Sequence, residues 1–136
     1  MIWLKNEFVV SDDAALLQSE TVYELLSNTY WASTRTKELV EASIRGSMCF
    51  GLYHNGKQIG FARVVTDKAV FSWIMDVVVH EDYRGMKLGH WLMECILDHP
   101  EIKHTAFGLA TKDAQEFYRK FGFTEKPCMA RPVQVV

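Results

Sequence analysis

The chain has 136 residues, 49% of them apolar and 24% charged, and its formal net charge is −2 at pH 7. This length and balance predict one globular domain over residues 1–136 and leave no room for two. The slightly acidic balance argues against a nucleic-acid partner held on a basic surface.

No apolar run is long enough to span a membrane, and the first residues lack the basic-then-apolar order of a signal peptide. The three cysteines (Cys49, Cys95 and Cys128) are odd in number and form no CxxC pair, which indicates a reducing compartment. We therefore expect a cytoplasmic protein with no membrane partner. The five histidines show no metal-ligand spacing, so we expect no metal site.

The first 46 residues predict one strand and two helices. A short strand is expected within Ile2–Val10, whose end is rich in apolar residues. One helix begins near Glu20, and a second follows Thr36, which can cap it, and ends at Gly46. Apolar side chains share one face of each helix: Val22, Leu25 and Leu26 in the first, and Leu39, Val40 and Ile44 in the second.

The middle of the chain predicts three antiparallel strands. Met48–His54 and Lys57–Thr66 are joined by Asn55-Gly56, a pair that suits a type I′ turn because both central residues need positive φ. After a turn at residues 67–68, a long third strand is expected over Ala69–Val79.

The last third predicts a helix over Leu88–Asp98, a strand near Lys103–Ala110, a helix from about Thr111 to Gly122, and a final strand over Met129–Val136. The complete order is strand, helix, helix, three strands, helix, strand, helix, strand. It predicts an α/β or α+β fold with a mixed sheet and helices packed on its faces.

A glycine-bearing loop joins the third strand of the meander to the next helix. The helix start presents unpaired N–H groups and the positive end of the helix dipole, which together suit a phosphate. Gly85 and Gly89 lack a Cβ, so an anion can approach the backbone, and Arg84 adds a permanent cation. The alternative is an ordinary strand-to-helix turn whose glycines serve only its geometry.

Residues 77–89 read Val-x-Val-x-x-x-Tyr-Arg-Gly-x-x-Leu-Gly, which resembles the coenzyme A-binding segment of the GNAT superfamily of N-acetyltransferases. The order of elements also coincides with the GNAT fold, a mostly antiparallel sheet with helices on both faces. Lys87 departs from the family pattern, which usually has glycine there. The resemblance implies that acetyl-CoA binds through its pyrophosphate to the loop and through its pantetheine arm to the strand end. The implied cofactor-binding residues are Val77, Val78, Val79, Arg84, Gly85, Met86, Lys87, Leu88 and Gly89.

A second stretch, Ala114–Phe123, resembles the family's Ala-x-x-Phe/Leu-Tyr-x-x-x-Gly-Phe segment. The resemblance implies that Tyr118 protonates the departing thiolate, a transfer that a phenol with pKa near ~10 can make to a thiolate near ~8.5. The alternative is a core aromatic residue. Thr111 occupies a position where the family often has a cofactor-contacting asparagine, and it either contacts the cofactor or caps the helix.

Asp76 is the only acid in the apolar run 70–79. It serves either as the base that accepts the amine proton, directly or through water, or as an anchor that ties down a neighbouring loop by accepting backbone N–H bonds. Tyr30, Trp31 and Arg35 lie where the resembling family varies its substrate loops, which implies a substrate pocket. The alternative is that the aromatic residues pack the helix pair onto the sheet.

These observations predict a monomeric or homodimeric N-acetyltransferase that passes an acetyl group from acetyl-CoA to a primary amine of a small molecule, by direct attack in a ternary complex. The alternative from another class is a non-catalytic acyl-CoA-binding or interaction domain with the same fold. A third possibility is that the chain shares only the fold of the family and does not bind coenzyme A. The helix pair and the C-terminal strand are expected to line a pocket or to form a dimer surface.

Overall fold

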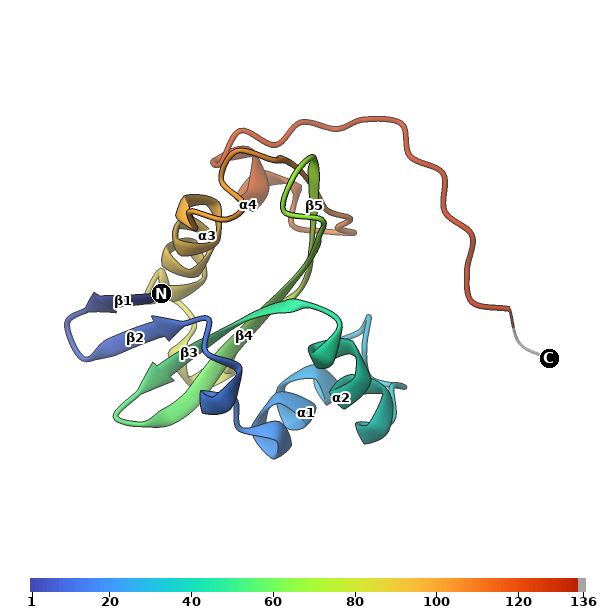
Figure 1. The fold of residues 1–136 in the computed structure, drawn as a ribbon. Coiled ribbons are helices and arrows are strands. Elements are labelled where there is room, and N and C mark those ends of the chain that lie inside the picture. Colours follow the sequence, from blue (N-terminus) through green and yellow to red (C-terminus); the bar gives the residue numbers. More distant parts are fainter. Residues whose placement is uncertain (135–136) are drawn as a thin grey trace.

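A six-stranded sheet in the order β1-β2-β3-β4-β5-β6 runs through the computed structural model, which describes residues 1–134 (Figure 1). All neighbouring strands are antiparallel except β5 and β6, which are parallel. The predicted mixed, mostly antiparallel sheet is therefore confirmed. The strands are β1 (Ile2–Lys5), β2 (Phe8–Ser11), β3 (Met48–His54), β4 (Lys57–Thr66), β5 (Phe71–Val79) and β6 (Ala106–Gly108).

The N-terminal segment forms a hairpin, so the prediction of a single strand within residues 2–10 was wrong. The chain reverses at Asn6 and Glu7, and Lys5 pairs with Phe8. Asn6 has a φ of 55°, a conformation that asparagine tolerates better than most residues. The turn-forming asparagine was the signal in the sequence.

The hairpin of β3 and β4 has the predicted bounds and the predicted turn. Asn55 has a φ of 51° and Gly56 a φ of 80°, so both central residues adopt the positive φ that a type I′ turn requires. The turn sets the register beside it, since His54 and Lys57 pair directly across it, and the register shifts once further on, between Tyr53 and Leu52.

Helices cover both faces of the sheet, as predicted (Figure 1). On one face, α1 and α2 bury residues such as Val22 and Val40 against Phe61, and Thr36 Oγ1 caps α2 by accepting from the Leu39 N–H at 3.1 Å. On the other face, α3 packs into the larger core. No helix among residues 1–134 is long and apolar enough to cross a membrane. The helices are α1 (Ser19–Ser27), α2 (Lys37–Arg45), α3 (Leu88–Asp98) and α4 (Gln115–Arg119), with short 3₁₀ turns η1 (Ala14–Leu16) and η2 (Glu81–Tyr83).

The C-terminal part departs most from the predictions. Strand β6 and helix α4 are both shorter than expected. Residues 129–134 form no strand, so that prediction was wrong for them, and residues 135–136 lie outside the described residues. A strand requires a partner, and no neighbouring strand of the same chain pairs with residues 129–134.

Substitution of a core leucine tests the packing of α3. Leu92 is fully buried in the core, whereas Leu39 on α2 is 56% exposed. Leu92→Ala should lower the free energy of unfolding by about 2–5 kcal/mol, because it removes buried apolar surface and leaves a cavity. Leu39→Ala, the same chemical change at the surface, should shift it by no more than about 0.5 kcal/mol. Urea unfolding monitored by circular dichroism measures both, and equal effects would contradict this assignment of the core.

Candidate functional site

A β-bulge in β5 shapes the centre of the molecule. On β4, Phe61 and Arg63 are two positions apart. Their partners on β5, Val78 and Met75, are three positions apart, so β5 contains one extra residue. The extra residue is accommodated at Asp76, which has a φ of 58°. Aspartate tolerates this left-handed conformation better than the β-branched residues around it. An acid inside an apolar strand was the only sign of the bulge in the sequence.

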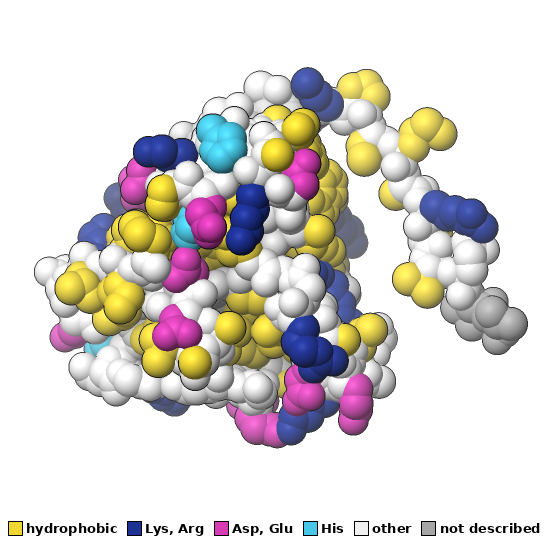
Figure 2. All heavy atoms as spheres, viewed as in Figure 1, with side chains coloured by type: hydrophobic (Ala, Val, Ile, Leu, Met, Phe, Trp, Pro, Cys, Tyr) yellow, Lys and Arg dark blue, Asp and Glu magenta, His cyan; other side chains and the backbone are white. Residues whose placement is uncertain are grey.

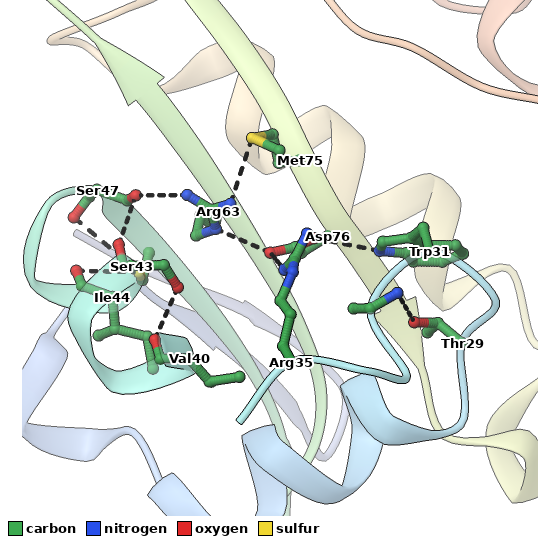
Figure 3. A network of polar contacts seen from close by, with 12 residues as sticks. Thr29, Trp31, Arg35, Val40, Ser43, Ile44, Ser47, Arg63, Met75 and Asp76 are labelled. Atoms are coloured by element: carbon green, nitrogen blue, oxygen red, sulfur yellow. Dashed lines mark hydrogen bonds and ion pairs between the residues drawn. The ribbon is translucent and has the colours of Figure 1, made fainter. Parts of the chain in front are cut away.

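Three side chains hold the Asp76 carboxylate, which is 1% exposed (Figure 3). Oδ2 accepts from Arg35 Nη1 and from Arg63 Nε, each at 2.8 Å. Oδ1 accepts from Trp31 Nε1 at 3.1 Å. Arg63 is itself held by Ser47, whose Oγ lies 3.0 Å from Nη1. We call Trp31, Arg35, Arg63 and Asp76 the Asp76 clamp. The sequence analysis did not include Arg63 in the site, although an arginine in an apolar strand was a signal.

The clamp determines the charge state of Asp76. Burial by itself raises the pKa of this carboxyl, but the hydrogen bonds and charges of Arg35 and Arg63 outweigh burial and hold the pKa below its ordinary value. A carboxylate with a lowered pKa and both oxygens occupied is a weak proton acceptor. The contacts therefore favour the anchoring alternative, with side chains rather than backbone N–H groups as the partners.

The loop between α1 and α2 brings aromatic residues to α4. The Tyr30 ring meets Trp31 edge to face with centroids 5.1 Å apart, and Lys112 Nζ lies 5.6 Å from the Tyr30 ring centroid. Burial raises the pKa of the Tyr118 phenol, and neighbouring Tyr30 raises it further. The structure thus brings the residues predicted for substrate binding close to those predicted for catalysis.

The end of β5 has an edge that no strand covers among residues 1–134. Strand β6 pairs with β5 only over Phe71–Trp73. On the other side, the His80 N–H donates to Ile59 O at 2.7 Å, so alternate residues of β5 face β4. Val77 and Val79 consequently turn their backbone groups toward the uncovered edge, and Val79 O accepts from Arg84 Nε at 3.2 Å.

The loop after β5 is exposed from Arg84 to Lys87 and leads directly into α3. Gly85 has a φ of 85° and nothing within 4 Å of where a Cβ would lie. Lys87 has a φ of 61° and precedes the first residue of α3. The Trp91 N–H donates to Lys87 O, which is the first hydrogen bond of this helix. The N–H groups of the helix residues before Trp91 therefore have no partner within the helix. The first turn also lacks an acidic residue, so it suits an anion.

Thr111 acts as a turn cap in this structure. Its Oγ1 accepts from the Ala114 N–H at 3.0 Å, immediately before α4. This contact matches the capping alternative. A cofactor contact would compete for the same hydroxyl.

Other chemistries find no support in the described chain. Burial raises the pKa of the Cys49 thiol to about 11 and that of Cys95 to about 12, so neither is poised as a nucleophile. Residues 1–134 contain no group of three His, Cys, Asp or Glu side chains that could hold a metal ion.

Comparison with known proteins identifies the class. Residues 45–125 match the family described as the acetyltransferase (GNAT) domain, so the chain belongs to this family. A candidate GNAT acetyltransferase from Xanthomonas campestris pv. campestris is 36% identical, superposes with a TM-score of 0.88, and is matched over 93% of each chain. The family predicted from residues 77–89 and 114–123 is thereby confirmed.

Two further proteins are similar to this chain, one in sequence and one in fold. A Gibberella zeae protein named as a candidate acetyltransferase is 28% identical over 69% of this chain, which spans a little under two thirds (64%) of that relative. A GNAT family acetyltransferase from Elizabethkingia anophelis with acetyl-CoA bound is 17% identical, with a TM-score of 0.71 over 90% of this chain and 80% of its own. At that identity the likeness shows the shared fold alone.

The clamp predicts a pH-dependent contribution to stability. Because the pKa of folded Asp76 is lowered, its contribution is present above the ordinary pKa of about 3.9 and is lost as the pH falls through the lower folded value. Asp76→Asn should destabilise the protein at pH 7 by about 3–5 kcal/mol, because Arg63 is left buried without its partner charge. The deficit relative to wild type should shrink below pH ~4. Urea unfolding over this pH range measures it, with exposed Asp82→Asn as control, and a deficit independent of pH would contradict the prediction.

Proposed function

We propose that this protein is an acetyl-CoA-dependent N-acetyltransferase whose acceptor is a primary amine of a small molecule. The observation that carries the proposal is the uncovered edge of β5 at Val77–Val79, which runs into a phosphate-suited loop and the N-terminus of α3. An extended arm with a pyrophosphate at one end fits both parts of this arrangement.

The residues present fit acetyl-CoA, which when bound would supply the activated acetyl thioester. Val77 and Val79 would pair their backbone groups with the pantetheine arm, while the buried side chain of Val78 keeps the strand fixed. The pyrophosphate would be held by backbone N–H groups of the loop and of the first turn of α3. The proposed loop residues are Arg84, Gly85, Met86, Lys87, Leu88 and Gly89, with Thr111 as a weaker contact because its hydroxyl caps a turn.

Tyr118 is proposed as the acid toward the thiolate. A phenol with the ordinary pKa of about 10 is protonated at neutral pH, so a proton is available on Oη. Burial raises the pKa of Tyr118 and does not change this protonation state. Asp76 is proposed as a positioning residue: through Trp31 and Arg35 it fixes the loop that carries Tyr30. Acceptance of the amine proton by Asp76 remains a prediction that the pH profile of Asp76→Asn would test.

The acceptor would bind beside Tyr30, Trp31 and Arg35. All three come from one short loop between α1 and α2, and two of them are fixed by the clamp. Such a small aromatic surface, in which the Arg35 guanidinium is paired with Asp76, suits a small molecule better than an extended polymer. Rigid placement of the amine against the thioester is the main contribution that this geometry can make to the rate.

Calorimetric titration with acetyl-CoA tests the binding half of the proposal. Arg84→Ala should weaken the affinity roughly tenfold to a hundredfold, because a charge-assisted hydrogen bond to phosphate is lost. Gly89→Trp should weaken it at least as much by filling the space at the helix start. Arg45→Ala, an exposed arginine at the end of α2, should leave the affinity unchanged. Absence of saturable binding at millimolar acetyl-CoA would refute the proposal.

Turnover with a panel of small primary amines tests the catalytic half. Tyr118→Phe should reduce kcat by about 10²–10⁴ while the acetyl-CoA affinity stays unchanged, since only the phenolic proton is removed. Thiol release measures the rate. A wild-type protein that binds acetyl-CoA and releases no thiol with any amine, above the rate of hydrolysis, would favour the non-catalytic acyl-CoA-binding alternative instead.

A further inference from the structure

Tyr83 lies directly before the loop of residues 84–89, which we call the phosphate loop, and the proposed function assigns it no role. It is the last residue of η2. Its ring packs against the core of the sheet and meets Phe8 edge to face, with centroids 6.2 Å apart. Its hydroxyl lies 2.9 Å from Nδ1 of His54, so a hydrogen bond joins the start of the loop to the end of β3.

His54 is held in place by its own neighbours. Its ring stacks on Phe8 with centroids 4.8 Å apart, and its Nε2 lies 3.3 Å from Oε1 of Glu7. It is also the last residue of β3, directly before the Asn55-Gly56 turn. The bond to Tyr83 forms with either neutral tautomer, because Nδ1 can donate to the phenolic oxygen or accept from the hydroxyl. Tyr83 is therefore tied to the sheet.

The phosphate loop needs a fixed start because its own backbone is exposed and strained. Residues 84–87 are all exposed, and the φ of 61° at Lys87 is a left-handed conformation that costs free energy in a residue with a Cβ. At the far end, Leu88 is 5% exposed and fixes the loop to the core. At the near end, the side chain that enters the body is that of Tyr83. These two side chains hold the strained segment between them.

The shape of the loop matters more for phosphate affinity than the overall charge of the molecule. On the face that Figure 2 shows, Lys and Arg side chains are interspersed with Asp and Glu side chains, and the formal net charge of the chain is −2. Such a mixture attracts a distant anion only weakly. The unpaired N–H groups at the start of α3 bind phosphate well if they are presented in one arrangement beforehand, since a loop that must first be ordered loses affinity.

We propose that Tyr83 and His54 are positioning residues for the cofactor: their hydrogen bond holds the phosphate loop in the shape that receives the pyrophosphate. This inference rests on the proposed function. Both residues act through the loop rather than on the reacting atoms, so they contribute to the binding of acetyl-CoA and not to the chemical step. The cofactor site thereby extends from the loop to the hairpin of β3 and β4.

Calorimetric titration with acetyl-CoA tests the pair. Tyr83→Phe keeps the packed ring and removes only the hydroxyl, so it should weaken the affinity about threefold to tenfold. His54→Leu should weaken it by a similar factor, whereas His54→Asn should retain most of it, because the amide places a polar atom where Nδ1 lies. Tyr83→Phe combined with His54→Leu should weaken it no more than either change alone. Tyr23→Phe, the same chemical change on α1, should leave the affinity unchanged.

The outcomes separate this inference from the proposed function. A wild-type protein that binds no acetyl-CoA would refute the proposed function and this inference with it. A wild-type protein that binds, together with a Tyr83→Phe variant that binds equally well, would overturn this inference alone. Losses in the two single variants that add up in the double variant would overturn it as well, because the two side chains would then act independently.

Trypsin digestion tests the loop without any cofactor. Arg84 and Lys87 are exposed cleavage sites within it. Tyr83→Phe should increase the rate of cleavage at these sites several-fold, because the loop opens more often once its start is released. Cleavage after Lys68, in the turn between β4 and β5, should stay unchanged. Equal loop cleavage in the wild type and in Tyr83→Phe would overturn the proposal, and so would an equal increase at Lys68, which would indicate general destabilisation.

Discussion

The ion pairs of Asp76 with Arg35 and Arg63 are the interaction on which the site depends. They connect the bulged strand β5, its neighbour β4 and the loop between α1 and α2 at one buried carboxylate. A charge so deeply buried is tolerated only with full compensation, and here each carboxylate oxygen accepts at least one hydrogen bond. The carboxylate therefore stabilises one arrangement of the loop that presents Tyr30 and Trp31.

Past the bulge, the end of β5 is the second feature on which the proposed site depends. The extra residue at Asp76 changes the direction of β5 just before Val77, and β6 accompanies β5 only as far as Trp73. The strand end is therefore left with an open edge at the point where the chain turns into the loop and α3. The bulge thus places the carboxylate that holds the proposed acceptor loop, and the short pairing of β6 leaves open the edge proposed for the cofactor.

Much of the fold could be predicted because it depends on local chemistry. The β3–β4 turn follows from Asn55-Gly56, and the bounds of α3 follow from an apolar stripe at helical spacing between Lys87 and His99. The failures occurred where partners decide the structure. The strand expected over residues 129–134 has the composition of a strand but no neighbour in its own chain, and the first strand is divided by a turn that a single asparagine makes possible.

The sequence by itself determined the family, because the family is carried by short motifs whose meaning does not depend on distant contacts. The proposals for the phosphate loop and for Tyr118 come from the same motifs. Only the tertiary structure shows which side chains hold Asp76. Its partners Trp31, Arg35 and Arg63 lie 13 to 45 residues away along the chain, and periodicity cannot show that they converge on one carboxylate. The protonation state of an acid depends on such neighbours, so its chemical role is determined by folding rather than by residue type.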